Sequence, residues 1–211
     1  MSVENDGAVR VTLPRRAPLR AADEAVRELA PWIERRRRAL ARVAAEVART
    51  PGTVPYLGAE LRLVPEPGRT RVHRRGDSLL VPADEVVGAG GSMLVPAGEV
   101  AIERWYRRAA RAEIAPRLDA AVARAGTSYT KLTIRGQRTR WGSCSQAGAM
   151  SFNWRLLLAP EPVLDYVVEH EVCHLEVMDH SPRFWALLES RVPDWRAHAA
   201  WLRRYGSTLV L

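Results

Sequence analysis

The sequence predicts an α+β fold from two features: short runs of alternating apolar and polar residues, and longer segments in which apolar residues recur every three to four positions. Hydrophobic residues make up 47% and charged residues 27% of the 211 residues, which is typical of folded soluble proteins. A chain of this length can bury a core within one domain. We therefore expect the strands and helices to form one compact unit.

The N-terminal segment is expected to contain a strand followed by a long helix. Residues 9–13 alternate apolar and polar side chains, as a half-buried strand does. Residues 23–50 carry apolar side chains at helical spacing, and Pro31 should begin or bend this helix because proline has no backbone N–H. The arginine run at residues 35–38 is interpreted as a solvent-facing flank of the helix.

Residues 53–83 should form a small antiparallel β-meander. Its short alternating runs are separated by Pro67-Gly68 and Gly76-Asp77, which are residue pairs that favour turns. The strand, the helix and the meander define an expected N-terminal region over residues 1–97. Residues 98–211 form the second expected region.

The second region should begin with a long helix over residues 99–125. Pro116 is able to divide this helix, and Gly126 is placed to end it. Two strands are expected next, over residues 130–135 and 150–156, on either side of a turn.

Helical periodicity returns after Pro160, and three helices are expected between this residue and Gly206. Proline is well tolerated in the first turn, so Pro160 and Pro162 mark the start of one helix. Ser181 followed by Pro182 is typical of an N-cap with proline at the first helical position. Pro193-Asp194 should open a final helix.

Residues 170–174 read His-Glu-Val-Cys-His, the HExxH pattern, within the helix expected after Pro160. Histidines four positions apart on a helix differ by about 40° in direction and about 6 Å in height, so both imidazoles can reach one metal ion. Glu171 can reach a water on that ion without ligating it. The spacing predicts one zinc ion bound by His170 and His174, with Glu171 as the catalytic base.

His180 is the expected third zinc ligand. On a continuous helix it would point away from the other two histidines, so the helix should end near Met178-Asp179 and the chain should turn back. Imidazole also suits zinc. The rival third ligands are carboxylates, namely Glu176, Asp179 and Glu189.

A zinc site of this kind predicts a hydrolase. Zinc lowers the pKa of a bound water to near 7, Glu171 removes its proton, and the resulting hydroxide attacks a carbonyl. An exposed strand edge beside the metal helix often orients such a substrate, and residues 150–156 are the expected strand. Peptide-bond cleavage is therefore the favoured reaction, with a peptide or protein as substrate.

Four blocks of sequence together resemble the YgjP-like metallopeptidase family. They read Arg138-Thr-Arg-Trp-Gly-Ser-Cys-Ser145, Phe152-Asn-Trp-Arg155, Tyr166-Val-Val-Glu-His-Glu-Val-Cys-His-Leu175 and His180-Ser-Pro-Arg-Phe-Trp185. The resemblance implies a zincin-like fold, in which the HExxH helix packs on a small mixed or antiparallel sheet, and a family domain over about residues 20–206. It also implies zinc ligands at His170, His174 and His180, makes Glu171 the base, and makes residues 98–211 the metal-binding catalytic region. The family is related in motif to SprT-like proteases, which act on proteins bound to DNA.

The residues around Trp141-Gly-Ser-Cys144 are candidates for substrate binding. Arg140, Ser143 and Asn153 either contact substrate or build the hairpin beside the metal helix. For Trp141, packing is the favoured interpretation.

Two other classes of function stay open. The formal charge is +8, and Lys131 is the single lysine among 32 basic residues. Arginines suit phosphates, so a metal-dependent nucleotide phosphohydrolase, similar to a pyrophosphatase, is one alternative. A non-enzymatic zinc-stabilised module that binds DNA or protein is the other, and it would need a fourth protein ligand such as Cys144 or Glu189.

The cellular setting is expected to be the cytoplasm, with no membrane partner. The two cysteines, Cys144 and Cys173, form no CxxC pair and demand no oxidising compartment. No apolar stretch is long enough to span a bilayer. Nucleic acid is an allowed but not a required partner, and the sequence does not determine the oligomeric state.

Overall fold

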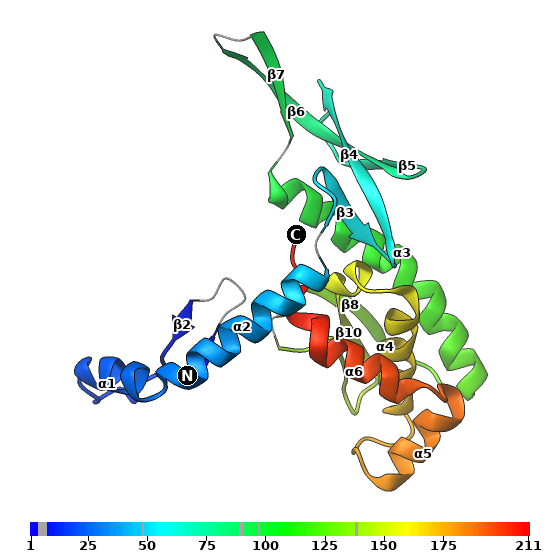
Figure 1. Cartoon of the computed structure of the whole chain (residues 1–211). Helices are drawn as coiled ribbons and strands as arrows, with labels where there is room; N and C mark the ends of the chain where they lie inside the picture. The colour runs from blue at the N-terminus through cyan, green and yellow to red at the C-terminus, as the bar shows by residue number, and fades with distance from the viewer. Residues whose placement is uncertain (4–7, 48, 89–90, 97, 138) are drawn as a thin grey trace. The chain divides into compact units, whose positions relative to one another are not determined.

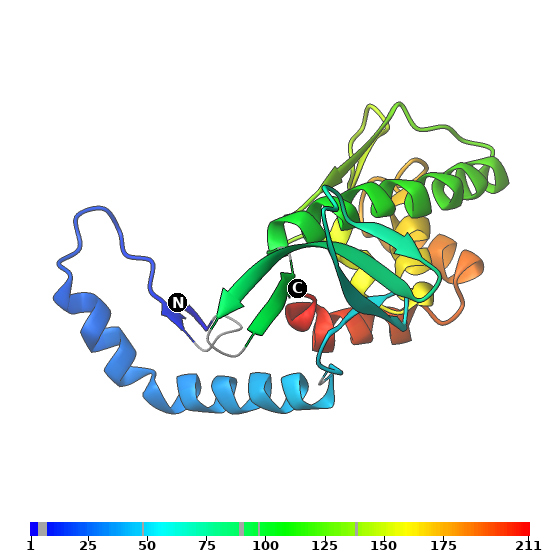
Figure 2. The same cartoon turned by 90° about the horizontal axis from the view of Figure 1, so that it is seen from above.

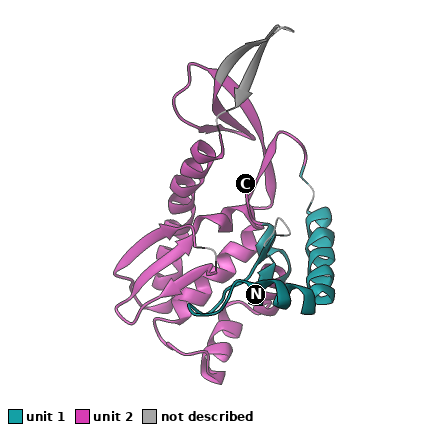
Figure 3. Cartoon of the chain, turned by 90° about the vertical axis from the view of Figure 1, so that its left-hand side faces the viewer, with its two compact units in different colours: residues 1–49, 204–208 teal, residues 50–203, 209–211 magenta. Residues whose placement is uncertain are grey.

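The computed structural model describes residues 1–3, 8–47, 49–88, 91–96, 98–137 and 139–211, with residues 84–88 and 91–96 described by their backbone alone (Figures 1 and 2). The chain divides into two compact units, residues 1–49 with 204–208 and residues 50–203 with 209–211 (Figure 3). The expected border between residues 97 and 98 lies within the second unit, and Ala97 is outside the described residues. That border therefore stays a prediction.

The first unit contains a short hairpin and two helices. Strands β1 (Ser2–Val3) and β2 (Val9–Arg10) pair in antiparallel orientation. Helix α1 (Arg20–Glu28) ends at Leu29, and helix α2 (Ala30–Glu46) begins directly after it with Pro31 in its first turn. The single helix expected from residue 23 onward is thus two helices, because the ring of a proline clashes with the carbonyl four residues earlier.

The second unit contains a mixed five-stranded sheet. Its strands are β3 (Thr53–Tyr56), β4 (Ala59–Pro67), β5 (His73–Arg75), β6 (Ser78–Gly88) and β7 (Gly91–Pro96). The order is β3-β4-β6-β5, and β7 pairs with β6. The expectation of an all-antiparallel meander is wrong for one pair, because β4 and β6 run parallel. After β4 the chain first forms β5 at the edge of the sheet. It then returns through the β5–β6 hairpin and places β6 between β4 and β5.

A three-stranded sheet in the same unit has the order β8-β10-β9. Strand β8 (Lys131–Arg135) runs parallel to β10 (Ala149–Asn153), and β9 (Gly142–Cys144) runs antiparallel to it. The strand expected over residues 150–156 ends at Asn153, where the side-chain Oδ1 accepts a hydrogen bond from the amide of Arg155 at 3.1 Å. This cap starts a 3₁₀-helix, Trp154–Leu158.

Four α-helices complete the second unit, and two of them, α3 and α4, pack against this smaller sheet. Helix α3 (Glu99–Ala125) passes Pro116 without a break and ends at Gly126, whose φ of 64° is the left-handed conformation of a C-cap. Helices α4 (Glu161–Cys173), α5 (Pro182–Arg191) and α6 (Trp195–Tyr205) follow, and the last residues of α6 belong to the first unit. Helix α3 packs on α4 and β8, and α4 packs on β9.

The core of the second unit extends from the five-stranded sheet, along α3, to α4 and the smaller sheet. The fully buried side chains there include Tyr106, Ile114, Leu118, Met150, Phe152, Trp154, Leu156 and Leu164. These elements confirm the predicted α+β class with small mixed sheets. Across the described part of the chain, no helix combines the length and apolar character that crossing a membrane requires.

Candidate metal centre

Helix α4 ends earlier than the sequence suggested, and this end shapes the site. The helix was expected to reach Met178-Asp179, but its last residue is Cys173 and His174 occupies the C-cap. The amide of Val177 bonds back to the carbonyl of Cys173 at 2.9 Å, so the chain turns at once after the helix. The early turn leaves the following residues free to double back.

The three histidines of the predicted site come together. Their ligand nitrogens all lie within 4.8 Å of one another. His170 comes from α4 and His174 from its C-cap, while His180 comes from the loop that ends at Ser181, the N-cap of α5. The predicted N-cap and the following Pro182 are therefore where the sequence indicated, and they begin α5 directly after His180.

The donor set fits a tetrahedral zinc ion. The Nε2 atoms of His170 and His180 are 3.1 Å apart. Two nitrogens that each lie about 2.0–2.1 Å from a tetrahedral zinc would be separated by about 3.3 Å, close to this distance. Desolvation by burial, followed by the neighbouring His174 and His180, lowers the pKa of His170 to about 3. Burial also lowers the pKa of His174, so both rings favour the neutral form that binds metals.

A backbone carbonyl orients one of these rings. The Nδ1 atom of His174 lies 3.1 Å from the carbonyl oxygen of Val177, which the early end of α4 brings within reach. A hydrogen bond there fixes the tautomer and leaves Nε2 as the metal-binding nitrogen. The Nδ1 atom of His170 is buried and finds no such partner among the described residues.

Phe184 forms an aromatic wall behind the histidines. Its ring is fully buried, and its centroid lies 4.9 Å from that of His170, 4.5 Å from that of His174 and 4.8 Å from that of His180. An apolar shell of this kind limits solvent access around a metal. Phe184 stands in the quoted His180–Trp185 block, but sequence reasoning gave it no role because a ring contact is visible only in three dimensions.

Glu171 is buried beside the histidines and against strand β9. Its exposed fraction is 6%, and desolvation raises the pKa of its carboxyl to about 7. A Cβ atom placed on Gly142 would lie 2.7 Å from Cγ and 2.8 Å from Cδ of Glu171, which is too close for any side chain. Glycine at position 142 therefore allows β9 to approach the carboxylate, a role that the sequence analysis missed.

The candidate substrate-binding residues lie in and around the β9–β10 hairpin. The hydroxyls of Ser143 and Ser151 are 2.8 Å apart. Asn153 is 3% exposed, and its Nδ2 donates to the carbonyls of Gln137 at 2.6 Å and Arg140 at 3.1 Å. These bonds hold the loop before β9 in place, while the Arg140 side chain is exposed. Contact of these residues with a substrate stays a prediction. Arg138, the first residue of the quoted block, lies outside the described residues.

Among the strands that the structure describes, β9 and not β10 forms the edge of the sheet beside Glu171. The expectation that residues 150–156 present an exposed edge is wrong, because β10 is the central strand and pairs on both sides. The amide of Ser145 donates to Ala149 at 3.0 Å and the amide of Asn153 donates to Trp141 at 2.8 Å. Since paired residues alternate along an antiparallel ladder, the N–H and C=O groups of Gly142 and Cys144 point away from β10.

Other polar groups considered as metal ligands are engaged elsewhere. Glu189 is paired with Arg196 at 2.5 Å and Glu176 with Arg191, while Asp179 accepts a hydrogen bond from the amide of Ser181 at 3.3 Å. Neither Glu189 nor Cys144 belongs to the histidine group. Burial, and next to it Glu171, raises the pKa of the Cys144 thiol to about 11, which disfavours the thiolate.

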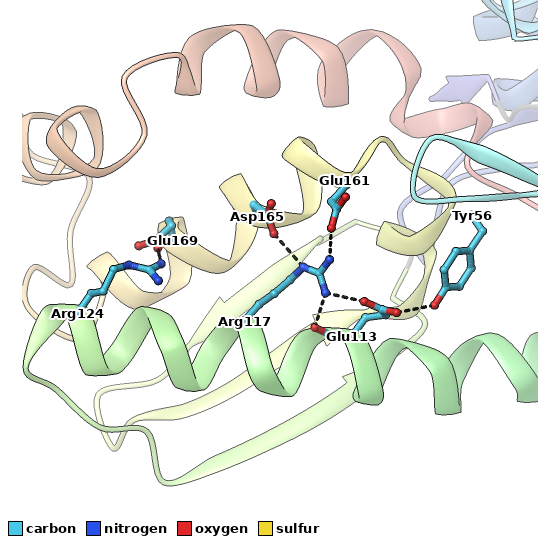
Figure 4. A network of polar contacts seen from close by, with 7 residues as sticks. All are labelled: Tyr56, Glu113, Arg117, Arg124, Glu161, Asp165 and Glu169. Atoms are coloured by element: carbon cyan, nitrogen blue, oxygen red, sulfur yellow. Dashed lines mark hydrogen bonds and ion pairs between the residues drawn. The ribbon is translucent and has the colours of Figure 1, made fainter.

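A network of ion pairs fixes helix α4 to helix α3 (Figure 4). Glu161, Asp165 and Glu169 stand four residues apart on α4, and all three face arginines of α3. Arg117 binds Glu161 and, at 3.0 Å, Asp165, while Arg124 binds Glu169. The helix that carries both histidines of the HExxH pattern is therefore held along its length.

The same network continues to strand β3. Arg117 also pairs with Glu113 on its own helix at 2.6 Å, and the hydroxyl of Tyr56 donates to the other oxygen of Glu113 at 2.8 Å. Burial, with the neighbouring Glu113, raises the pKa of Tyr56 to about 12, so its hydroxyl stays protonated as a donor. Strand β3, helix α3 and helix α4 are thus joined through one arginine (Figure 4).

A histidine cluster next to a buried glutamate, within a mixed α/β fold, is the arrangement expected of a metal-dependent hydrolase. Residues 1–205 match the model of the YgjP-like, metallopeptidase domain family, and the chain belongs to this family. This confirms the resemblance seen in the four sequence blocks. Membership indicates a metal-dependent peptidase and implies a metal cofactor. No curated protein matches the chain.

Proposed function

We propose that this protein is a zinc-dependent peptidase in which His170, His174 and His180 hold one zinc ion and Glu171 is the catalytic base. The observation that carries the proposal is the gathering of three imidazole nitrogens within 4.8 Å beside a carboxyl that is 6% exposed. A purely structural zinc site closes its fourth position with a protein ligand and needs no adjacent base. Here the carboxylates that could have closed it are paired with arginines or with backbone.

Glu171 is suited to accept and return a proton. A bound zinc ion would supply a water acidified toward neutral pH and a Lewis acid for the substrate carbonyl. The buried carboxyl of Glu171, with its pKa raised to about 7, can hold a proton at one Oε atom and later release it to the leaving amine. Because residue 142 is a glycine, no side chain at this position of β9 enters the space that the carboxyl occupies.

Strand β9 is the proposed binding surface for the substrate backbone. The outward N–H and C=O groups of Gly142 and Cys144 can pair with an extended peptide, which would add a strand to the β8-β10-β9 sheet next to Glu171. Arg140 and Ser143 flank this edge and are proposed to contact the peptide. Asn153 is proposed to position the edge through its bonds to Gln137 and Arg140.

The test compares the wild type with Glu171→Gln. Purified wild-type protein should contain close to one zinc per chain and should digest an unfolded protein such as casein. The Glu171→Gln variant should retain the zinc and lose the activity, since the amide cannot accept the proton. Glu99→Gln, at an exposed position on α3, is the matched control and should behave as the wild type does.

Two outcomes would overturn the proposal. A zinc-loaded wild type that releases phosphate from nucleoside triphosphates and cleaves no peptide would make the protein a nucleotide phosphohydrolase. A zinc-loaded protein that is inactive on both substrate classes would favour a zinc-stabilised binding module.

A further inference from the structure

Helix α2 of the first unit carries an arginine cluster whose charge is not neutralised along the helix. Its arginines are Arg35, Arg36, Arg37, Arg38 and Arg42, and its acidic residues are Glu34 and Glu46. Glu34 pairs with Arg37 at 3.4 Å, and Glu46 pairs with Arg204 at 2.7 Å and accepts a hydrogen bond from Tyr205 at 2.9 Å. Glu34 thus pairs with one arginine of the cluster, Arg37, and Glu46 pairs with Arg204 of α6.

Three of these arginines share one face of the helix. Arg35, Arg38 and Arg42 are spaced at i, i+3 and i+7, which places them within about 60° of one another and along about 10 Å of the helix axis. All three are exposed, and no carboxylate of the described residues forms an ion pair with them. We call them the α2 arginine face.

The apolar side of α2 points in another direction. Ile33 is buried, and Leu40 and Val43 are half-buried. At about 100° per residue, Ile33 and Leu40 lie about 170° from the middle of the α2 arginine face, and Val43 lies about 105° from it. Packing within the protein therefore leaves the arginines directed into solvent.

The first unit as a whole is strongly basic. Residues 1–49 and 204–208 contain twelve arginines against seven acidic residues, so they hold more than half of the net charge of +8. A concentrated positive field attracts anionic partners over a Debye length of about 8–10 Å at moderate ionic strength.

We propose that the α2 arginine face binds the phosphate backbone of a nucleic-acid duplex without reading its sequence. Guanidinium groups bind phosphate oxygens through two parallel hydrogen bonds, and three of them in a row match a polyanion with regularly spaced charges. Trp32 is the aromatic residue of α2, and although it is 38% exposed it points about 90° from the middle of this face, so no ring lies between the arginines as a platform for stacked single-strand bases. Ile33 and Leu40 lie nearly opposite this face, so it carries no apolar side chain that could enter a bilayer.

The test measures the salt dependence of duplex binding with the full-length protein. Fluorescence anisotropy follows a labelled DNA duplex of mixed sequence and about 20 base pairs, between about 50 mM and about 200 mM NaCl. The wild type should bind, and its affinity should fall steeply with salt. A triple variant, Arg35→Gln with Arg38→Gln and Arg42→Gln, should bind at least about tenfold more weakly at the lowest salt. The salt slope, which is the slope of the logarithm of the binding constant against the logarithm of the salt concentration, should be smaller in magnitude by about 2–3.

Two further variants separate a local surface from bulk charge and from misfolding. A control variant in the second unit removes the same charge at three exposed positions, by Arg71→Gln, Arg104→Gln and Arg108→Gln. Its salt slope should differ from that of the wild type by no more than about 1. The triple lysine variant at positions 35, 38 and 42 retains the charge and should retain most of the binding.

The proposal is overturned if the wild type does not bind the duplex at the lowest salt, or if the glutamine variant of the α2 arginine face binds as the wild type does. It also fails if the second-unit control loses as much affinity, because net charge would then explain the binding. Binding to vesicles rich in phosphatidylserine in preference to the duplex would replace the proposed partner by a membrane surface.

Discussion

Helices α4 and α2 hold their functional side chains by opposite means. Helix α4 is buried over most of its length, so His170 and Glu171 are fixed by packing, by the close approach of β9 and by ion pairs to α3. Helix α2 buries only Ile33 and directs its arginines into solvent. The comparison teaches that a substitution near α4 should change stability and chemistry together, whereas one on the α2 arginine face should change binding alone.

The largest loss of stability is expected at the aromatic wall of the candidate metal centre. Phe184→Ala removes a fully buried ring, so the free energy of unfolding should fall by about 3–5 kcal/mol, as measured by denaturant titration. In the first unit, Leu19 is 85% exposed, and Leu19→Ala should change the same quantity by less than about 0.5 kcal/mol. Equal effects at the two positions would remove the contrast between the regions.

Gly142→Ala tests whether β9 must approach Glu171 so closely. The added methyl group would displace the carboxyl, and a displacement of about 1 Å can reduce turnover about 100-fold. Zinc content should be unchanged, since Gly142 provides no ligand. Gly98→Ala, where a Cβ meets nothing within 4 Å, is the control. Full peptidase activity in the Gly142 variant would show that the contact with Glu171 is not required.

Arg117→Met tests the ion-pair network that fixes α4. The substitution leaves Glu113, Glu161 and Asp165 without their shared cation, and stability should fall by about 1–3 kcal/mol because the group is partly exposed. Arg107→Met breaks a more exposed pair with Glu103 and should cost less than about 1 kcal/mol. Thermal denaturation of both variants at one pH and salt concentration provides the comparison.

The smallest effect on stability is expected on α2. Arg38→Gln removes an exposed side chain without an ion-pair partner among the described residues, so the free energy of unfolding should change by less than about 0.5 kcal/mol. A larger loss, measured by the same denaturant titration, would mean that the arginine supports the fold. The α2 arginine face would then no longer be a surface reserved for binding.

Local signals in the sequence predicted the class of fold and favoured His180 as the partner of His170 and His174, and the family resemblance favoured it further over the rival carboxylates. The HExxH spacing and the Ser181-Pro182 start of α5 are short-range features. They indicate that His170 and His174 share one face of a helix and that the chain turns near His180. The early end of α4 was not predictable in this way, because Met178-Asp179 provides a plausible helix end five residues later. The carbonyl of Val177 that orients His174 follows from that early end.

Long-range packing accounts for what the sequence did not reveal. The parallel pairing of β4 with β6 depends on where the chain passes after β4, and turn residues do not specify that path. The roles of Phe184 and Gly142 arise from contacts with α4 that span many residues. Both residues stand within the quoted motif blocks, which marks them in the sequence. Which side chains they contact is visible only in the folded structure.

The most direct test of the account is a zinc titration of the metal-free protein, together with the variants His180→Ala and Glu189→Gln. The account predicts one zinc per chain in the wild type, unchanged zinc affinity in Glu189→Gln, and an affinity at least about 100-fold lower in His180→Ala, since one of three protein ligands is lost. Undiminished zinc affinity in His180→Ala would contradict the three-histidine centre.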